Sequence, residues 1–394
     1  MTIDASRPAT VGVRLAIRRI HLWLGLTVGL LFALLGLTGS ALVFYTAIDG
    51  VLHPVVQAER SAPAPDWQSP IWDRALATGR TRWNDPGGKW TFEVTGEPGA
   101  IPARYYAMPG GHGDRMMVWF SRDGTRIVRA EPWGGYLMSW LYQLHMQLLA
   151  GEFGRQLVGW SGVAMLILIV TGLFAWWPRG SWRKAVAFKR AAAPIRRLHD
   201  IHKLSGLWSA VVLLILVGSG ILLALPDVTQ ALVRPAALPA PRSSGQDGKE
   251  ISVVDALGIA HRAMPDGRLT FLDVPNARDA PMRMRFQLPG DPHPRFPGSY
   301  VFVDRTTGRV LAVHDVRRNG SGTTVASWIR TLHDGTVGGM ATRILAVLAG
   351  LMPAILFATG VLRWRRRRRG ATPAMRSPTT GRDGPVSPVS RRGR

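Results

Sequence analysis

The sequence predicts a membrane α-helical bundle of four transmembrane helices, built from a tandem repeat and carrying two extracytoplasmic α+β domains. Three observations lead to this fold class. Four apolar runs are each long enough to cross a bilayer at about 1.5 Å of rise per residue. The stretches 139–176 and 327–364 match each other without gaps. Polar regions follow the first and third apolar runs, so each half of the chain reads as helix, polar domain, helix.

The match between the halves rests on residue types that unrelated apolar helices do not share. Two such helices would both contain leucines, but not a histidine, a Thr-Gly pair and a tryptophan at the same offsets. His21 and His202 also correspond, since each opens a long apolar run with Gly39 or Gly220 at position +18. The other residues in register are Ser139 and Ser327, Trp140 and Trp328, Leu144 and Leu332, His145 and His333, Thr171 and Thr359, Gly172 and Gly360, and Trp176 and Trp364.

Composition and charge limit the class of protein. The chain has 394 residues, 46% of them apolar, and contains no cysteine. The lack of cysteine excludes disulfides, thiolate zinc sites, iron–sulfur clusters and covalent c-type haem attachment. The net charge of +24 gathers beside the ends of the apolar runs, which indicates membrane topology and no nucleic-acid partner. By the positive-inside rule, both termini and the loop 178–200 are cytoplasmic, and both polar domains lie outside.

The apolar runs and their flanks set the predicted boundaries. The first run lacks a small-residue cleavage site directly after it, so we interpret it as a retained anchor and not as a signal peptide. In order, the segments are 1–19, cytoplasmic N-terminus; 20–45, first transmembrane helix; 46–138, first periplasmic domain; 139–177, interfacial helix and second transmembrane helix; 178–200, cytoplasmic loop; 201–225, third transmembrane helix; 226–326, second periplasmic domain; 327–364, interfacial segment and fourth transmembrane helix; and 365–394, basic disordered cytoplasmic tail.

Turn signals predict local structure inside these segments. In the first polar domain, 118–120 and 126–128 flank Ser-Arg-Asp-Gly-Thr, which is typical of a β-hairpin. Gly151 and Gly154 predict a break between the interfacial helix and the second span. In the second polar domain, a helix over 251–263 precedes short strands at 269–274, 282–288, 299–303 and 309–314, which indicates a small α+β domain.

Several of these motifs resemble the PepSY-associated transmembrane family. They are Arg-Arg-x-His-x-x-x-Gly at the start of a span, Leu-His before a Gly-broken helix, Thr-Gly-x-x-x-Trp at a helix exit, and the hairpin Val-Phe-Val-Asp-Arg-Thr-Thr-Gly-Arg-Val-Leu. The resemblance covers the chain from Arg14 to Arg369. It implies PepSY-like outer domains and a location in the bacterial inner membrane. It further implies similarity to haem-containing reductases that act on ferric siderophores in the periplasm and serve iron uptake.

Four histidines are the candidate cofactor ligands. Parallel repeats place equivalent residues at equal depth on facing helices, which pairs His21 with His202 near the cytoplasmic face and His145 with His333 near the outer face. A lone histidine among apolar residues is usually structural, but ionisable residues in membrane segments are costly and tend to be functional. Without cysteine or matched methionines, each pair predicts a bis-His haem b, about two haems in all.

His199 is an alternative ligand to His202. It lies three residues earlier on roughly the same helix face, and its Arg-Arg-x-His context matches that of His21. The spacing to Gly206 and Gly220 favours His202, and both residues remain candidates.

These features predict a haem-dependent ferric-chelate oxidoreductase that passes electrons across the inner membrane. No nucleotide-binding fingerprint is present, so the electron donor is expected to be quinol or a separate cytoplasmic reductase. The alternative is a non-enzymatic PepSY sensor or regulator that binds a periplasmic peptide or protease. That alternative predicts no haem and leaves the four matched histidines unexplained.

Overall fold

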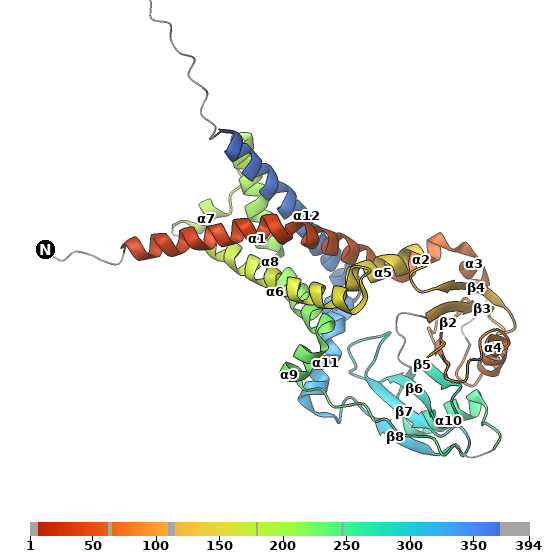
Figure 1. The fold of residues 1–394 in the computed structure, drawn as a ribbon. Coiled ribbons are helices and arrows are strands. Elements are labelled where there is room, and N and C mark those ends of the chain that lie inside the picture. The colour runs from red at the N-terminus through yellow and green to blue at the C-terminus, as the bar shows by residue number, and fades with distance from the viewer. Residues whose placement is uncertain (1–6, 62–64, 109–114, 179, 246–247, 371–394) are drawn as a thin grey trace, which may run out of the picture.

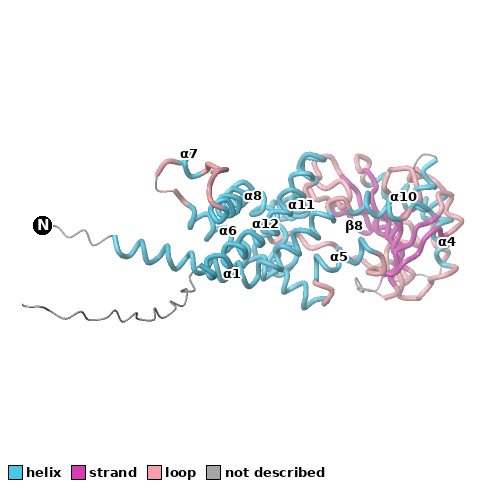
Figure 2. Tube along the Cα trace, turned by 90° about the horizontal axis from the view of Figure 1, so that it is seen from above, coloured by secondary structure: helices cyan, strands magenta, loops and turns pink. Residues whose placement is uncertain are grey.

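The computed structural model describes residues 7–61, 65–108, 115–178, 180–245 and 248–370 (Figure 1). It consists of a bundle of long helices and one sheet domain at one end of the bundle (Figure 2). The described start of the chain and the loop between the second and third long helices lie toward the opposite end.

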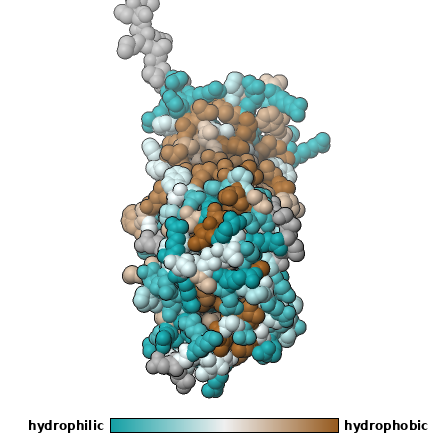
Figure 3. Space-filling view, turned by 90° about the vertical axis from the view of Figure 1, so that its right-hand side faces the viewer, coloured by the Kyte–Doolittle hydropathy of each residue, from teal (hydrophilic) through white to brown (hydrophobic). Residues whose placement is uncertain are grey.

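Four long helices form the bundle, and all four are long and apolar enough to cross a membrane. No more than 33% of any of their apolar windows is buried inside the protein, so most of this apolar surface requires lipid around it. In Figure 3 the apolar surface forms a brown band below a hydrophilic end. The protein is therefore a multi-pass membrane protein. The helices are α1 (Arg7–Leu42), α6 (Gly151–Trp176), α8 (Pro194–Ala224) and α12 (Gly339–Gly370).

Small residues allow close helix crossings within the bundle. Helix α1 packs against α6 and α12, and α8 packs against the same two helices. At the α1–α12 crossing, a Cβ atom on Gly36 would lie 2.2 Å from the carbonyl oxygen of Gly350. The hydroxyl of Ser40 donates to the carbonyl of Val347 at 3.1 Å across the same crossing. Glycine and serine thus bring the two backbones together, as in other membrane helix pairs.

The long helices extend beyond the predicted spans. Helix α1 begins inside the predicted N-terminal segment, α8 begins at Pro194 and not at 201, and α12 continues to Gly370. Arginine and lysine are good helix formers, so the helices continue past their apolar runs. The first residues of the predicted disordered tail are therefore helical, and residues 371–394 lie outside the described part.

Shorter helices join the bundle to the sheet domain. Helix α5 (Leu137–Gln147) leads into α6 through Leu148, Leu149 and Gly151, whose φ angles of 50°, 59° and 57° lie in the left-handed region. This turn is the break that the sequence predicts there. In the second half, α11 (Gly320–His333) precedes α12 in the same way. The other short elements are α2 (Tyr45–Leu52), α3 (Pro54–Gln57), α7 (Trp182–Ala185), α9 (Pro226–Val233) and the 3-10 turns Ala58–Ser61 and Thr336–Gly338.

The sheet domain is one antiparallel sheet of eight strands in the order β4-β3-β2-β1-β5-β6-β7-β8. Each half of the chain contributes one helix followed by four consecutive strands. Helices α4 (Ile71–Arg80) and α10 (Val253–Ala263) cover the same face of the sheet and share one apolar core with it. The strands are β1 (Lys89–Glu93), β2 (Ile101–Tyr106), β3 (Arg115–Phe120), β4 (Ile127–Pro132), β5 (Arg268–Pro275), β6 (Met282–Gln287), β7 (Ser299–Val303) and β8 (Val310–His314).

The prediction of two separate outer domains is wrong, because strand β1 pairs with β5. This pairing runs from Lys89 opposite Pro275 to Glu93 opposite Phe271 and joins the two four-stranded halves. A four-stranded half alone would expose β1 or β5 as an edge with unpaired N–H and C=O groups, and pairing removes both edges. Helix α4 and strands β1 and β2 were not predicted from the sequence.

The turn between β7 and β8 is fixed by the buried carboxylate of Asp304. It accepts backbone N–H groups from Ser244 at 2.7 Å, Thr306 at 2.9 Å and Thr307 at 2.8 Å. Burial alone would raise the pKa of Asp304, but these hydrogen bonds outweigh it and hold the pKa well below its ordinary value. The ionised carboxylate therefore ties the 244 segment to the hairpin.

We expect Asp304→Ala to destabilise the sheet domain by about 3 kcal/mol, because three buried N–H groups lose their acceptor. The folded-state pKa is depressed, so this contribution is present above the unfolded pKa of about 4 and is lost as pH falls below it. Melting temperatures of the purified protein at pH 7 and pH 3.5 measure the effect. Asp304→Asn keeps one acceptor and should lose less. Equal melting temperatures of wild type and Asp304→Ala at pH 7 would contradict this role.

Candidate haem-ligating site

The four matched histidines form two pairs. The ring centroids of His21 on α1 and His202 on α8 lie 6.3 Å apart, with an angle of 89° between the ring planes. The centroids of His145 on α5 and His333 on α11 lie 6.1 Å apart, with an angle of 40°. Each pair joins one residue from each half of the chain. The first pair, which we call the inner pair, lies toward the end of the bundle away from the sheet domain, and the second, which we call the outer pair, lies toward the sheet.

Each histidine is anchored through Nδ1 to a neighbouring helix. His21 Nδ1 donates to the carbonyl of Leu168 at 3.1 Å, and His202 Nδ1 donates to the carbonyl of Leu356 at 3.1 Å. His333 Nδ1 donates to the carbonyl of Leu216 at 2.8 Å. The fourth ring, His145, bonds in the same way to the carbonyl of Leu35 and to the hydroxyl of Thr38.

A hydroxyl residue follows each of these carbonyls by three positions and also contacts Nδ1. The hydroxyl of Thr38 lies 3.1 Å from Nδ1 of His145 and itself donates to the carbonyl of Leu34 at 2.8 Å. Because its proton is used in this way, the hydroxyl oxygen accepts from Nδ1. The equivalent hydroxyl–Nδ1 distances are 3.3 Å for Thr171 to His21, 3.4 Å for Ser219 to His333 and 3.0 Å for Thr359 to His202.

The residue after each hydroxyl is a glycine, and the imidazole lies against it. A Cβ atom would lie 2.8 Å from Cε1 of His145 at Gly39, 2.8 Å from Cε1 of His333 at Gly220, and 2.9 Å from Cε1 of His21 at Gly172. At Gly360 the distance to Cε1 of His202 is 3.6 Å. The same arrangement of hydroxyl, glycine and histidine thus occurs four times, with one looser copy.

This arrangement leaves Nε2 available on all four rings. A carbonyl oxygen can only accept, so Nδ1 carries the proton and the neutral ring presents an unprotonated Nε2. Within the described ranges, Nε2 of these four histidines has no hydrogen-bond partner. Two imidazoles that bind one metal ion from opposite sides at about 2.1 Å have centroids about 6.5 Å apart. The observed separations of 6.1 and 6.3 Å lie within about 0.4 Å of that value.

Two histidines at each site suit a metal cofactor whose metal ion already has most of its ligands. Among the residues that the structure describes, no cluster of three or more His, Cys, Asp or Glu side chains could hold a bare metal ion. A haem iron already has four porphyrin nitrogens and needs only two axial ligands from the protein. Two neutral imidazoles with centroids about 6 Å apart therefore fit a bis-His haem better than a zinc site.

His199 lies outside the inner pair. Its Nδ1 is 3.6 Å from the carboxylate of Asp200, while His202 faces His21. Asp200 is fully buried and also contacts Lys203 at 3.1 Å and Arg196 at 3.4 Å. Of the two alternatives at this end, the geometry favours His202, and Asp200 accounts for the position of His199.

Sequence reasoning missed a histidine that supports the outer pair. His293 is buried in the loop between β6 and β7, and its Nδ1 accepts the backbone N–H groups of Arg295 and Phe296, each at 3.1 Å. Its Nε2 therefore donates to the carboxylate of Asp334 at 2.9 Å. Asp334 directly follows His333, so this bond ties the sheet domain to the outer pair. His145 is followed by Met146, so the repeat comparison gave no signal for this contact.

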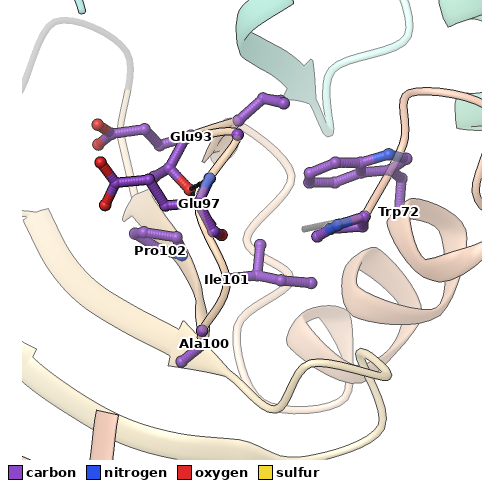
Figure 4. Close-up of a pocket in the computed structure, with 11 residues that line it drawn as sticks. Trp72, Glu93, Glu97, Ala100, Ile101 and Pro102 are labelled. Carbon is purple, nitrogen blue, oxygen red and sulfur yellow. Dashed lines mark hydrogen bonds between the residues drawn. The ribbon is translucent and has the colours of Figure 1, made fainter. Parts of the chain in front are cut away.

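The small hollow at the β1–β2 turn is not a ligand site. Trp72, Glu93, Glu97 and Ile101 line it, and both carboxylates extend away from the Trp72 indole (Figure 4). Its free volume of about 10 Å³ holds one water molecule at most.

A comparison with family models supplies the classification. The model of the PepSY-associated TM region matches residues 18–367, which include both histidine pairs and all eight strands. The chain belongs to this family. No curated protein matches the sequence. Membership in the PepSY-associated family agrees with four membrane helices and a sheet domain, and it leaves the cofactor and the reaction to be argued from the geometry.

Gly360 has more room beside its histidine than the other three glycines, so it provides a matched control for the glycine–imidazole contact. We expect Gly172→Ala to displace His21 and cost about 1–3 kcal/mol, because its Cβ would lie 2.9 Å from the ring. Gly360→Ala, at the equivalent position with 3.6 Å of room, should cost little. Thermal unfolding of both variants in one detergent measures the difference. Equal losses would show that the contact with His21 is not what requires glycine.

Proposed function

We propose that this protein is a transmembrane di-haem b oxidoreductase that passes electrons across the bacterial inner membrane to a ferric siderophore or another ferric chelate for iron uptake. The proposal rests on one observation. Two pairs of imidazoles, one toward each end of the bundle, have their ring centroids about as far apart as those of two axial ligands on one iron.

In this proposal His21 and His202 hold one haem, and His145 and His333 hold the other. Each haem supplies a one-electron ferric/ferrous couple when bound. The protein fixes the ring orientations through Nδ1 and presents neutral Nε2 ligands. His21 and Gly39 are 18 residues apart on α1, so the two sites are separated by about 27 Å along the bundle.

The reaction would be a one-electron reduction of the chelated Fe(III) to Fe(II), with the electron supplied by quinol or a separate cytoplasmic reductase. Hard oxygen ligands bind Fe(II) more weakly than Fe(III), so reduction would release the metal. The basic helix ends support the proposed orientation, with both termini cytoplasmic and the sheet in the periplasm.

The repeated order of elements supports a duplication. Each half contains a long helix, a helix with four strands, a short helix ending near a histidine, and a second long helix. We propose that the halves are two copies of one unit, with two PepSY-like sheets fused side by side.

A sensor or regulator is the alternative function. An open groove on the far side of the sheet domain is lined by Trp67, Gln68, Val254, Gly258 and Arg262, and a peptide could bind there. This reading requires no haem, so one spectrum separates the two functions.

We expect detergent-purified protein to show sharp low-spin b-type bands in a reduced-minus-oxidised spectrum, with about two haems per chain in a pyridine haemochrome assay. His333→Ala and His21→Ala should each remove about one haem, because each breaks one pair. His261→Ala is the control, since His261 stacks on Trp67 outside both pairs.

A preparation that stays colourless after haem supplementation would refute the proposed reductase function and favour the sensor. Retention of both haems in His333→Ala would refute the assignment of the outer ligands. If both haems are present, reduction of ferric chelates by the prereduced protein is measured next.

A further inference from the structure

The face of the sheet opposite α4 and α10 is charged and aromatic. Residues directly opposite on neighbouring antiparallel strands point to the same face. Arg104 on β2 pairs with Thr91, Thr91 pairs with Asp273 on β5, and Asp273 pairs with Arg283 on β6. One register step away, Phe271 pairs with Arg285, which pairs with Tyr300 on β7. We call this surface the inner sheet face, because at β3 it packs against α2 and α5 of the bundle side.

Two further arginines reach this face from outside the strands. Arg295 in the β6–β7 loop binds the carboxylate of Glu93, with Nη2 at 2.9 Å from Oε2. Arg330 on α11 lies over the Phe296 ring at 5.1 Å, and Phe296 stacks on Phe271 at 5.5 Å. The loop and the helix thus bring cationic groups to the aromatic patch that the strands present.

Positive charge exceeds negative charge on the part of the inner sheet face formed by β1, β2, β5 and β6, away from the Arg129–Asp49–Glu131 cluster at β4. Glu93 is shared by Arg104 and Arg295, and Asp273 is shared by Arg283 and Lys89. The six cationic groups therefore meet two carboxylates. They are Lys89, Arg104, Arg283, Arg285, Arg295 and Arg330.

The nearby carboxylates of the loops are already occupied. Asp291 accepts the backbone N–H groups of Gly298 and His293, and Asp334 is bound by His293. Neither forms an ion pair with Arg285, whose guanidinium instead bonds to the hydroxyl of Tyr300. The Nε atom of Arg285 is buried and has no hydrogen-bond partner. Arg285 thus has no carboxylate partner of its own among the described residues, and its charge adds to the positive excess.

The inner sheet face is accessible and adjoins the outer histidine pair. The side chains of Lys89 and Arg283 are each 35% exposed. Arg330 precedes His333 by three residues on α11, and His293 joins the same loop to Asp334. A ligand on this face would therefore lie beside the proposed outer haem.

We propose that the inner sheet face binds a ferric chelate of net negative charge, such as a tris-catecholate or a polycarboxylate, and discriminates against cationic and neutral chelates. Arginine forks bind carboxylate and catecholate oxygens, and aromatic rings stack on planar ligands. The role of this ligand as electron acceptor rests on the proposed function. Its binding does not, since the residues that hold it are independent of haem.

The test uses gallium(III) chelates, which are not reduced, and the full-length protein in detergent. The probes are gallium tris-catecholate, gallium citrate and the cationic gallium complex of a linear trihydroxamate, titrated by calorimetry. We expect at least one anionic probe to bind about tenfold more tightly than the cationic one, and to weaken several-fold between 50 and 300 mM salt. The stronger anionic probe identifies the donor chemistry.

The variant R283Q/R285Q should weaken the anionic probe about tenfold, because two charged donors are lost. R126Q is the control: it removes an arginine that is 71% exposed in the β3–β4 turn. If the double variant unfolds, the salt series on the wild-type protein still tests the proposal. Equal affinity for anionic and cationic probes, or no salt dependence, would overturn it.

The two proposals fail separately. Anionic binding by a protein that holds no haem would refute the reductase and leave this site intact. Two haems and ferric-chelate reduction without charge preference would refute only this site.

Discussion

The bond from imidazole Nδ1 to a helix is the constraint on which the bundle depends. A polar ring between membrane helices must have its N–H group satisfied by protein, because lipid offers no acceptor. Here the N–H group donates to a serine or threonine hydroxyl and to the carbonyl oxygen three residues before it. The glycine after the hydroxyl residue leaves room for the ring. The contact fixes the spacing between helices and the direction of each ring. It also holds histidines from the two halves about 6 Å apart.

The continuous sheet is the second element that unites the halves. Pairing of β1 with β5 joins the two halves into one sheet, with α5 packed against its inner face and α11 against the β6–β7 loop. The ends of those two helices carry His145 and His333. Hydrogen bonding far from the membrane therefore contributes to the geometry of the outer pair, and the bond from His293 to Asp334 adds a direct link.

That link gives the inner sheet face its proposed role. The loop that carries His293 also carries Arg295 and Phe296, so one short segment touches the cationic cluster and the end of α11. In the proposal, an anion held by the arginines would lie next to the outer haem. The sheet would then serve both as a scaffold, through its apolar face under the helices, and as a binding surface, through its charged face toward the bundle.

Apolar length, turn residues and a repeated pattern are local signals, and they predicted the four spans, the break after α5, the strands of the second half and the histidine pairing. The choice between His199 and His202 as a ligand stayed open. Thr38 and Ser219 were not predicted as hydrogen-bond partners of His145 and His333, although each stands directly before a glycine that contacts the ring. The pairing of β1 with β5 and the bond from His293 to Asp334 are seen only in the folded structure. Both are contacts between segments far apart in the chain, and neither register nor loop position follows from local residue preference.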